Sequence, residues 1–226
     1  MKTDERLTQA EKIAMTLKKM IILKKIQPGE RINQEKMSKE LGVSKIPFRE
    51  ALKVLEAEGF VYSVPFKGSF VREHSLEYLQ ELYFIRSILE GISCSQATAR
   101  FQPTDIERLR ELFERSREGF ENEDYQTFIR YAEAFHDFIH EHSGFKRLPT
   151  MIHQLNIRSL ALYINPKEQC ERSIREHEFI FERIEARDAE GAGNAMRMHV
   201  QRSGMDTVRE IVRHLEAKTI ERVGYR

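Results

Sequence analysis

Apolar residues recur at helical spacing over most of the chain. Between positions 7 and 25 they fall at three- and four-residue steps, which predicts an amphipathic helix that ends before the turn at Pro28 and Gly29. Two shorter helices are predicted at 35–41 and 45–58. The first part of the chain is therefore predicted to contain three helices in quick succession.

The two short helices are joined by a three-residue turn. Asn33 is the predicted N-cap of the first helix and Ser44 that of the second, because their side-chain oxygens can accept hydrogen bonds from free helix N–H groups. Gly42 ends the first helix in a left-handed conformation, and Pro47 falls in the first turn of the second, where a missing N–H is tolerated. This pattern predicts a helix-turn-helix.

After Gly59 the pattern changes from helical to alternating. Short strands are predicted at 60–64 and 69–71, on either side of a hairpin tip at 65–68. A helix-turn-helix followed directly by a hairpin predicts a winged-helix DNA-binding domain over residues 1–75.

From residue 76 onward the pattern is helical, and Ser75 is the predicted N-cap of the next helix. Thr104 and Glu107 form a predicted capping box. Helices are predicted at 76–99, 105–121, 124–142, 148–163, 168–186 and 189–221. Short loops favour antiparallel neighbours, so residues 76–226 are predicted to form an all-α antiparallel helical bundle. The fold class is therefore mostly α, with a β-hairpin wing in the N-terminal domain.

Charge is distributed unevenly along the chain. The net charge is +1, but residues 1–75 hold 15 Lys and Arg against 10 Asp and Glu, and residues 76–226 hold 22 against 26. The excess of positive charge in residues 1–75 is typical of a domain that binds a polyanion such as DNA. The sequence has neither a membrane-length apolar run nor the apolar region of a signal peptide, so we expect no membrane partner and a cytoplasmic, nucleoid-associated protein. Cys94 and Cys170 lack motif spacing and are expected to be buried.

A basic stripe follows the predicted second helix of the helix-turn-helix. Lys45, Arg49 and Lys53 recur at four-residue steps, opposite an apolar stripe. Such a stripe on its own is most often a solvated face. On a helix that lies in the major groove, it can contact phosphates or the acceptor edge of guanine.

Residues 28–71 resemble the N-terminal domain of the GntR family of bacterial transcription regulators. The run PGERINQEKMSKELGVSKIPFREALKVLEAEGFVYSVPFKGSFV carries the resemblance almost without a gap. Two positions depart from the family pattern, since Lys45 stands where arginine is usual and Ile46 where threonine is usual, which weakens bidentate guanine reading and removes a hydroxyl. The resemblance implies DNA contacts from Ser44, Lys45, Pro47, Arg49, Lys67 and Gly68.

Three of the eight histidines are predicted to converge. His177 and His199 each lie 11 residues from Asp188, where the chain is predicted to turn between two helices. A helical hairpin there places the two imidazoles at the same height, and His136 lies on a third helix. Imidazoles converging inside a bundle predict a divalent metal site, for zinc or nickel. The alternative for each histidine is simple packing.

The second half of the chain resembles the FadR-like branch of the same family, whose C-terminal FCD domain binds effectors and dimerises. The segments AEAFHDFIHEHSG and EHEFIFERIEARDAEGAGNAMRMH carry this looser resemblance. It implies metal ligands at His136, His177 and His199, and an aspartate at the position where this chain has Ala132. The fourth ligand is then absent, or comes from water, from the effector or from another side chain such as His140.

Arg86 is the candidate effector-binding residue. It falls on the predicted inward face of the first bundle helix, with Leu79, Leu82, Tyr83, Ile85, Leu89 and Ile92. The resemblance implies that Arg86 meets an effector carboxylate. The alternative is an internal salt bridge with Glu90, four residues on.

These patterns predict a ligand-responsive transcription regulator and not an enzyme. It is expected to bind a pseudo-palindromic operator in double-stranded DNA as a homodimer, and to act as a repressor released by a small-molecule carboxylate. One alternative is an effector-independent DNA-binding protein. Another is a three-histidine metalloenzyme, which needs a general base beside the metal; Glu133 is the candidate, but it points to a different side of its helix.

Overall fold

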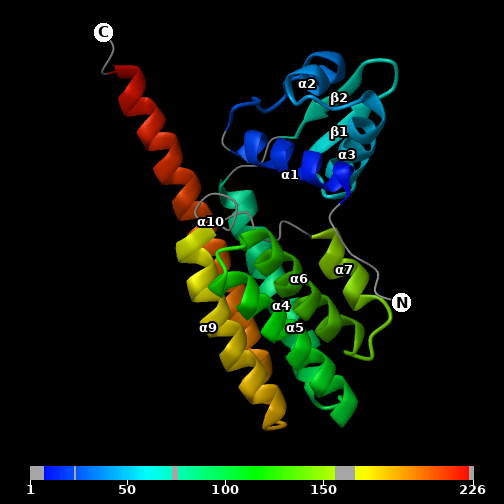
Figure 1. Ribbon diagram of the computed structural model, residues 1–226, viewed down its shortest axis with the longest axis vertical. Helices are drawn as coiled ribbons and strands as arrows, with labels where there is room; N and C mark the ends of the chain where they lie inside the picture. The colour runs from blue at the N-terminus through cyan, green and yellow to red at the C-terminus, as the bar shows by residue number, and fades with distance from the viewer. Residues whose placement is uncertain (1–7, 23, 73–75, 156–165, 224–226) are drawn as a thin grey trace. The chain divides into compact units, whose positions relative to one another are not determined.

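The computed structural model describes residues 8–22, 24–72, 76–155 and 166–223. The chain divides into two compact units, one containing residues 8–72 and the other residues 76–213 (Figure 1). The first unit holds a helix-turn-helix and a two-stranded hairpin, and the second is helical. The predicted fold class is confirmed. In the described part of the chain, no helix is long and apolar enough to span a membrane.

Three helices form the body of the first unit. They are α1 (Gln9–Ile22), α2 (Gln34–Glu40) and α3 (Lys45–Ala57). Helix α3 packs against α1, and its buried face consists of Phe48, Ala51, Leu52 and Leu55. The buried face of α1 includes Ile13, Ala14, Leu17 and Ile21. This shared apolar core fixes α3 so that its opposite, polar face points to solvent.

The wing is an antiparallel hairpin of β1 (Val61–Val64) and β2 (Gly68–Val71). Val61 pairs with Val71 at its base. At its tip, Phe66 and Gly68 both have positive φ angles, of 63° and 101°. Glycine adopts such a conformation without strain, whereas phenylalanine does so rarely. The hairpin begins and ends within one residue of the prediction.

The predicted helix caps are only partly confirmed. Asn33 caps α2, accepting a hydrogen bond from the Lys36 N–H at 3.0 Å. Ser44 occupies the N-cap of α3, but its side chain makes no capping hydrogen bond. The predicted capping box at Thr104 and Glu107 is wrong, because the next helix begins two residues earlier.

The actual capping box involves Gln102 and Asp105, and the Gln102 N–H donates to the Asp105 carboxylate at 2.8 Å. Proline starts that helix at position 103, where its missing N–H is tolerated. The predicted cap at Ser75 lies outside the described residues.

The second unit is helical throughout its described residues. Its helices are α4 (Leu76–Thr98), α5 (Pro103–Glu121), α6 (Tyr125–Glu141), the short α7 (Leu148–Gln154), α9 (Pro166–Glu185) and residues 189–213 of α10 (Ala189–Val223). Helix α6 contacts α4, α5, α7 and α9, so it occupies the centre of the unit. The helix predicted at 148–163 is confirmed up to Gln154, and positions 156–165 lie outside the described residues.

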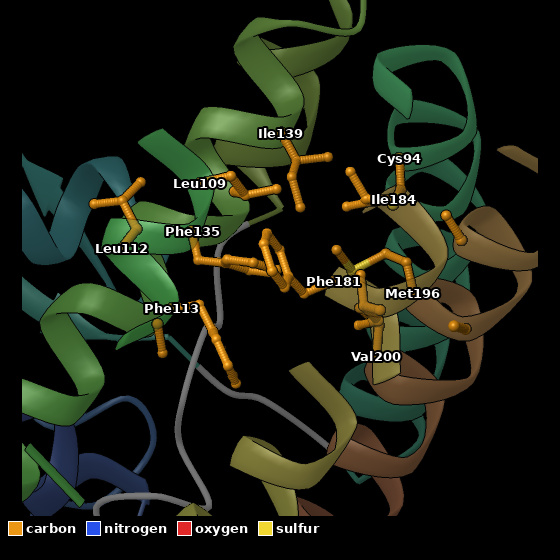
Figure 2. Close-up of a cluster of buried hydrophobic side chains, with 14 of the residues drawn as sticks. Cys94, Leu109, Leu112, Phe113, Phe135, Ile139, Phe181, Ile184, Met196 and Val200 are labelled. Carbon is orange, nitrogen blue, oxygen red and sulfur yellow. The ribbon is translucent and has the colours of Figure 1, made fainter. Parts of the chain in front are cut away.

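Phenylalanines from three helices fill the core (Figure 2). Phe113 of α5 stacks on Phe181 of α9, with ring centroids 5.7 Å apart, and lies 6.4 Å from Phe135 of α6. Met196 and Val200 bring α10 into the same cluster, together with Cys94 of α4. One continuous core thus holds rigid the helices that carry the predicted histidines.

Helix α4 follows the predicted amphipathic pattern only in part. Leu79, Leu82, Tyr83 and Arg86 are buried as predicted. Ile85 and Ile92, also predicted to face inward, are exposed, and so are Phe84 and Ile88. From Arg86 onward the buried face is polar or small, and contains Arg86, Ser87, Glu90, Gly91, Ser93, Cys94, Ala97 and Thr98. The prediction failed along this part of the helix because its inner face carries a polar network, while apolar residues lie on the outer face.

Small residues also let α4 approach α10 closely. A Cβ atom on Gly91 would lie 2.9 Å from the carbonyl oxygen of Gly193. About three turns further along α10, Tyr83 is in contact with Gly204, and its hydroxyl lies 3.2 Å from the hydroxyl of Thr207. This close packing positions the polar face of α4 beside the histidine-bearing part of α10.

Candidate functional site

The outer face of α3 is the candidate DNA-contacting surface. Ser44, Lys45, Arg49 and Lys53 are exposed there, and Pro47 is half-buried. The geometry places the basic stripe opposite the buried apolar face, as the helix-turn-helix arrangement requires.

Two of these cations already have acidic partners within the unit. Lys45 lies 3.1 Å from Glu35 on α2, and Lys53 lies 3.0 Å from Glu50 on α3. All four side chains are at least half exposed. Each pair therefore contributes at most about 1 kcal/mol to stability, and a DNA phosphate can replace the carboxylate.

The wing presents Lys67 and Gly68, with Arg31 beside them. The Arg31 guanidinium lies 3.3 Å from where a Cβ atom of residue 68 would stand, so a larger residue would shift this side chain slightly. The φ angle of 101° is the stronger reason for glycine at this position. Ile46 on α3, noted above as a departure from the family pattern, is 76% exposed, and Phe66 at the wing tip is more exposed still. Sequence reasoning gave Phe66 no role. A large apolar residue within a turn was the available signal.

The three predicted histidines meet inside the second unit. The Nε2 atoms of His136 on α6 and His177 on α9 lie 3.1 Å apart, and that of His199 on α10 lies 3.2 Å from His177. All three side chains are buried. Within the described residues, they form a group whose ligand atoms all lie within 4.8 Å of one another.

Carboxylates fix the orientation of two of these imidazoles. The Nδ1 atom of His136 lies 2.9 Å from Glu90, and that of His199 lies 2.7 Å from Glu176. Because an ionised carboxylate can only accept, each Nδ1 donates a proton, and each neutral imidazole then turns an Nε2 lone pair toward the other two histidines.

The convergence of these lone pairs favours a cation. His177 can donate a proton from Nε2 to only one of its two neighbours, and its Nδ1 has no hydrogen-bond partner in the described part of the chain. At least two lone pairs therefore face a common point. The residues fit a divalent metal ion held by three imidazole nitrogens, with carboxylates behind two of them.

The pKa values of the buried groups suit such a role. Burial lowers the pKa of His136 to about 4, against the opposing effect of Glu90. Burial, together with the neighbouring His199 and His136, holds the pKa of His177 well below its usual range. Both imidazoles are thus neutral near pH 7, and neutral imidazole is the form that binds metal.

Glu90 connects the histidines to Arg86. Its Oε1 atom accepts from the Arg86 guanidinium at 2.6 Å, while its Oε2 atom lies 2.9 Å from His136 and 3.2 Å from His140. Burial raises the pKa of the Glu90 carboxyl, but Arg86 and hydrogen bonds from His136 and His140 outweigh burial and hold it well below its usual range. Glu90 is therefore ionised.

The salt bridge predicted as the alternative role of Arg86 is present, but it does not use the whole guanidinium. Nη1 of Arg86 is buried and makes no hydrogen bond among the described residues. Arg86 also lines the cavity that contains the three histidines, together with Ala132. One donor of Arg86 is thus available beside the histidine cluster.

His140 does not belong to the three-histidine group. It groups with Glu90 and His136 instead, and its Nδ1 atom lies 3.2 Å from the Ser93 hydroxyl. Its ring nitrogens thus point to Glu90 and Ser93. Sequence reasoning also missed Glu90 and Glu176 as partners of His136 and His199, since each pair is separated by more than 20 residues.

Comparison with known proteins identifies the family. The profile of the FCD domain matches residues 81–202, more than half of the chain, and that of the bacterial regulatory proteins of the gntR family matches residues 9–71. The chain belongs to the GntR family and carries an FCD domain. GntR regulators bind DNA and FCD domains bind small-molecule effectors, so this protein is a DNA-binding transcription regulator and not an enzyme.

Individual GntR relatives match along most of their length. The uncharacterized HTH-type regulator YdhC of Bacillus subtilis is 27% identical over 187 residues, which cover 81% of this chain and 84% of YdhC. The HTH-type transcriptional repressor RspR of Escherichia coli is 24% identical over 207 residues, 89% of each chain. The structure of E. coli McbR/YncC matches with a TM-score of 0.62 at 27% identity, covering 87% of this chain and 95% of that one.

Proposed function

We propose that this GntR regulator is a repressor that binds a pseudo-palindromic operator as a homodimer and is released by a small carboxylate metabolite. The carboxylate binds beside a divalent metal ion, zinc or nickel. The convergence of three histidine Nε2 atoms on one cavity carries this proposal, because these donors would hold a Lewis-acidic metal ion in the cavity that Arg86 also lines. The name of the relative RspR, a transcriptional repressor, supports repression.

His136, His177 and His199 would hold the metal ion, which supplies a Lewis-acidic centre for an anionic oxygen. Glu90 and Glu176 keep two of the imidazoles in the metal-binding tautomer. Arg86 directs its unpartnered Nη1 donor to the effector carboxylate. In the dimer, the two DNA-binding units can adopt two relative arrangements. The effector shifts the equilibrium between these arrangements only by the difference in its affinity for them.

The operator contacts proposed for each head are Ser44, Lys45, Pro47, Arg49 and Lys53 on α3, with Lys67 and Gly68 on the wing. In this proposal, the residues of α3 enter the major groove, and the wing contacts the neighbouring backbone or groove. Exposure of all four cations supports this assignment.

The outer face of α4 supports the homodimer. Phe84, Ile88 and Ile92 recur at four-residue steps and are 54%, 37% and 46% exposed in the single chain. Phe84 also lines a groove of about 500 Å³ between α4 and α10, where Met205 is 64% exposed. An apolar stripe of this kind suits a second copy, which would bury the same stripe by two-fold symmetry.

Sedimentation velocity tests the dimer. Ile88→Asp places a charge in the centre of the stripe, and we expect it to convert a dimer to a monomer. Phe145→Asp, at a side chain that is 46% exposed outside the stripe, is the matched control and should remain dimeric. A monomeric wild-type protein contradicts the homodimer.

Operator release tests the regulatory part. Genomic fragments selected by the wild-type protein serve as operator, and fluorescence anisotropy follows their release by small carboxylates in the presence of zinc. His177→Ala should abolish release and retain DNA binding, whereas His153→Ala, at an exposed imidazole, should leave release unchanged. If the operator is retained under every condition, the protein is instead an effector-independent DNA-binding protein.

A further inference from the structure

Ile46 is a large apolar side chain near the start of α3, on the outer surface of the DNA-binding unit. It is the second residue of the helix and is 76% exposed. All residues of α3 are described, and no other large apolar side chain of this helix is exposed. A single apolar side chain on a protein surface is common and needs no partner. The position of Ile46 on α3, however, points to one.

Ile46 lies at the centre of the face that α3 turns away from the core. Successive residues of an α-helix are rotated by about 100° around its axis. By this rule, Ile46 lies about 170° from the mean direction of the four buried residues of α3. The packing of α3 on the core therefore holds Ile46 in the middle of the surface that the helix presents to solvent.

Cations surround Ile46 on this surface. Lys45 precedes it in the chain, Arg49 and Lys53 follow it by three and seven residues, and all three are exposed. Residues at these steps lie on one side of a helix. An apolar protein partner would have to remove these charges from water, which is unfavourable, whereas DNA pairs them with phosphates. The charge around Ile46 therefore selects DNA as its partner.

Thymine carries the apolar group that suits Ile46. In the major groove, the C5-methyl of thymine is open to contact by apolar side chains. Guanine, adenine and cytosine present hydrogen-bond donors and acceptors there, which isoleucine cannot satisfy. A β-branched side chain in a helix has one strongly preferred rotamer, so Ile46 loses little conformational entropy when it packs against a methyl group.

We propose that Ile46 is a specificity-determining residue that packs on the C5-methyl of a thymine in the operator. The inference rests on the α3 contacts proposed above and adds a base preference to them. Cytosine lacks the methyl and presents an amino donor instead, so a C·G pair at this position binds more weakly than a T·A pair. The neighbouring cations supply affinity for the backbone, and Ile46 supplies selectivity for one base.

Replacement of thymine by deoxyuridine tests the proposal, because it removes the C5-methyl and keeps the base pairing. An operator fragment selected from genomic DNA by the full-length protein is synthesised with one thymine replaced at a time, and binding is followed by fluorescence anisotropy. At one position for each bound α3, we expect the wild-type protein to bind the deoxyuridine operator about fourfold more weakly, the effect of one buried carbon. At the same position, 5-methyldeoxycytidine should bind more tightly than deoxycytidine.

Ile46→Ser removes the apolar side chain from α3. This variant should bind the thymine and deoxyuridine operators with affinities that differ by less than about twofold. Because Ile46 is exposed, the variant should also keep the thermal unfolding midpoint of the wild-type protein. Phe66→Ser and Phe145→Ser remove exposed aromatic side chains at the wing tip and in the second unit. Both controls should keep the wild-type response to deoxyuridine.

Four results overturn the proposal. If no thymine replacement weakens wild-type binding, Ile46 packs on no methyl group, and the proposed operator contacts stand without it. If Ile46→Ser keeps the wild-type response, or if Phe66→Ser loses it, another part of the unit contacts the methyl group. A wild-type protein that selects no fragment from genomic DNA contradicts the proposed operator itself, and the inference with it.

Discussion

The carboxylate of Glu90 holds Arg86 on one oxygen and His136 on the other, at 2.6 and 2.9 Å. The side chain of Glu90 is completely buried. One charge thus neutralises the arginine on the cavity wall and fixes the tautomer of a histidine. The candidate effector group and the candidate metal ligand are therefore joined through a single residue.

Replacing Glu90 by glutamine should weaken both fold and site. Glu90→Gln leaves the buried Arg86 cation without its counter-charge, and we expect a loss of about 3–5 kcal/mol in the free energy of unfolding. The measurement is urea denaturation. Glu171→Gln is the control, because Glu171 pairs with Arg175 on the surface and its loss should change stability by less than about 1 kcal/mol. Equal effects of the two variants would contradict a special role for Glu90.

The contact between α4 and α10 should not tolerate a methyl group. In Gly91→Ala the new Cβ would lie 2.9 Å from the Gly193 carbonyl oxygen and 3.1 Å from Cβ of Arg197. The Gly193 carbonyl belongs to the backbone of α10 and cannot move aside without moving the helix. We therefore expect the free energy of unfolding to fall by about 1–3 kcal/mol, although alanine has the better helix propensity. Thermal unfolding would detect it, with Glu121→Ala at an exposed position of α5 as control. An unchanged or higher Tm would show that the helices can separate.

The basic face of α3 should dominate operator binding. Removing Arg49 deletes an exposed cation from the centre of that face. If Arg49 contacts a base, we expect Arg49→Ala to weaken operator binding by about 1–3 kcal/mol. If Arg49 contacts a phosphate, we expect the slope of log binding constant against log salt concentration to fall in magnitude by about one. Lys36→Ala, which removes an equally exposed cation from α2, should change affinity little. Anisotropy titrations at several salt concentrations distinguish the two cases.

The two cysteines should be inert in the folded protein. Cys94 and Cys170 are completely buried, and burial raises the pKa of each thiol to about 12. The thiolate fraction at pH 8 therefore falls by about a thousandfold relative to an ordinary cysteine. A thiol-reactive reagent such as DTNB should label neither residue in native buffer and both in concentrated urea. Rapid native labelling of either one would show that the core opens readily.

Local patterns were sufficient to predict the DNA-binding unit. Caps, turns and alternating residues lie close together in sequence, and the helices and hairpin begin and end near their predicted positions. The histidine cluster was predictable for another reason. His177 and His199 are equally distant from Asp188, and a helical hairpin brings equidistant residues together, as the 3.2 Å separation of their Nε2 atoms confirms.

Partners contributed by distant segments could not be predicted in this way. Glu90 precedes His136 by 46 residues, and nothing in its local sequence points to that contact. The inner face of α4 was predicted only in part, because beyond Arg86 the helix is polar on its inner face and apolar on its outer face, at Ile88 and Ile92. Periodicity reveals that a helix has two faces, but it does not reveal which face packs against the core.

The acidic partners of Lys45 and Lys53 bear on how strongly the proposed DNA-contacting face holds any duplex. Glu35 and Glu50 present carboxylates to the two lysines much as a nucleic acid backbone presents phosphates. A bound duplex must displace both carboxylates, at a cost of at most about 1 kcal/mol for each pair. This cost is the same for random sequence and for an operator, so it shortens the residence time on every site alike. Discrimination between sites is then left to base contacts, which the carboxylates do not affect.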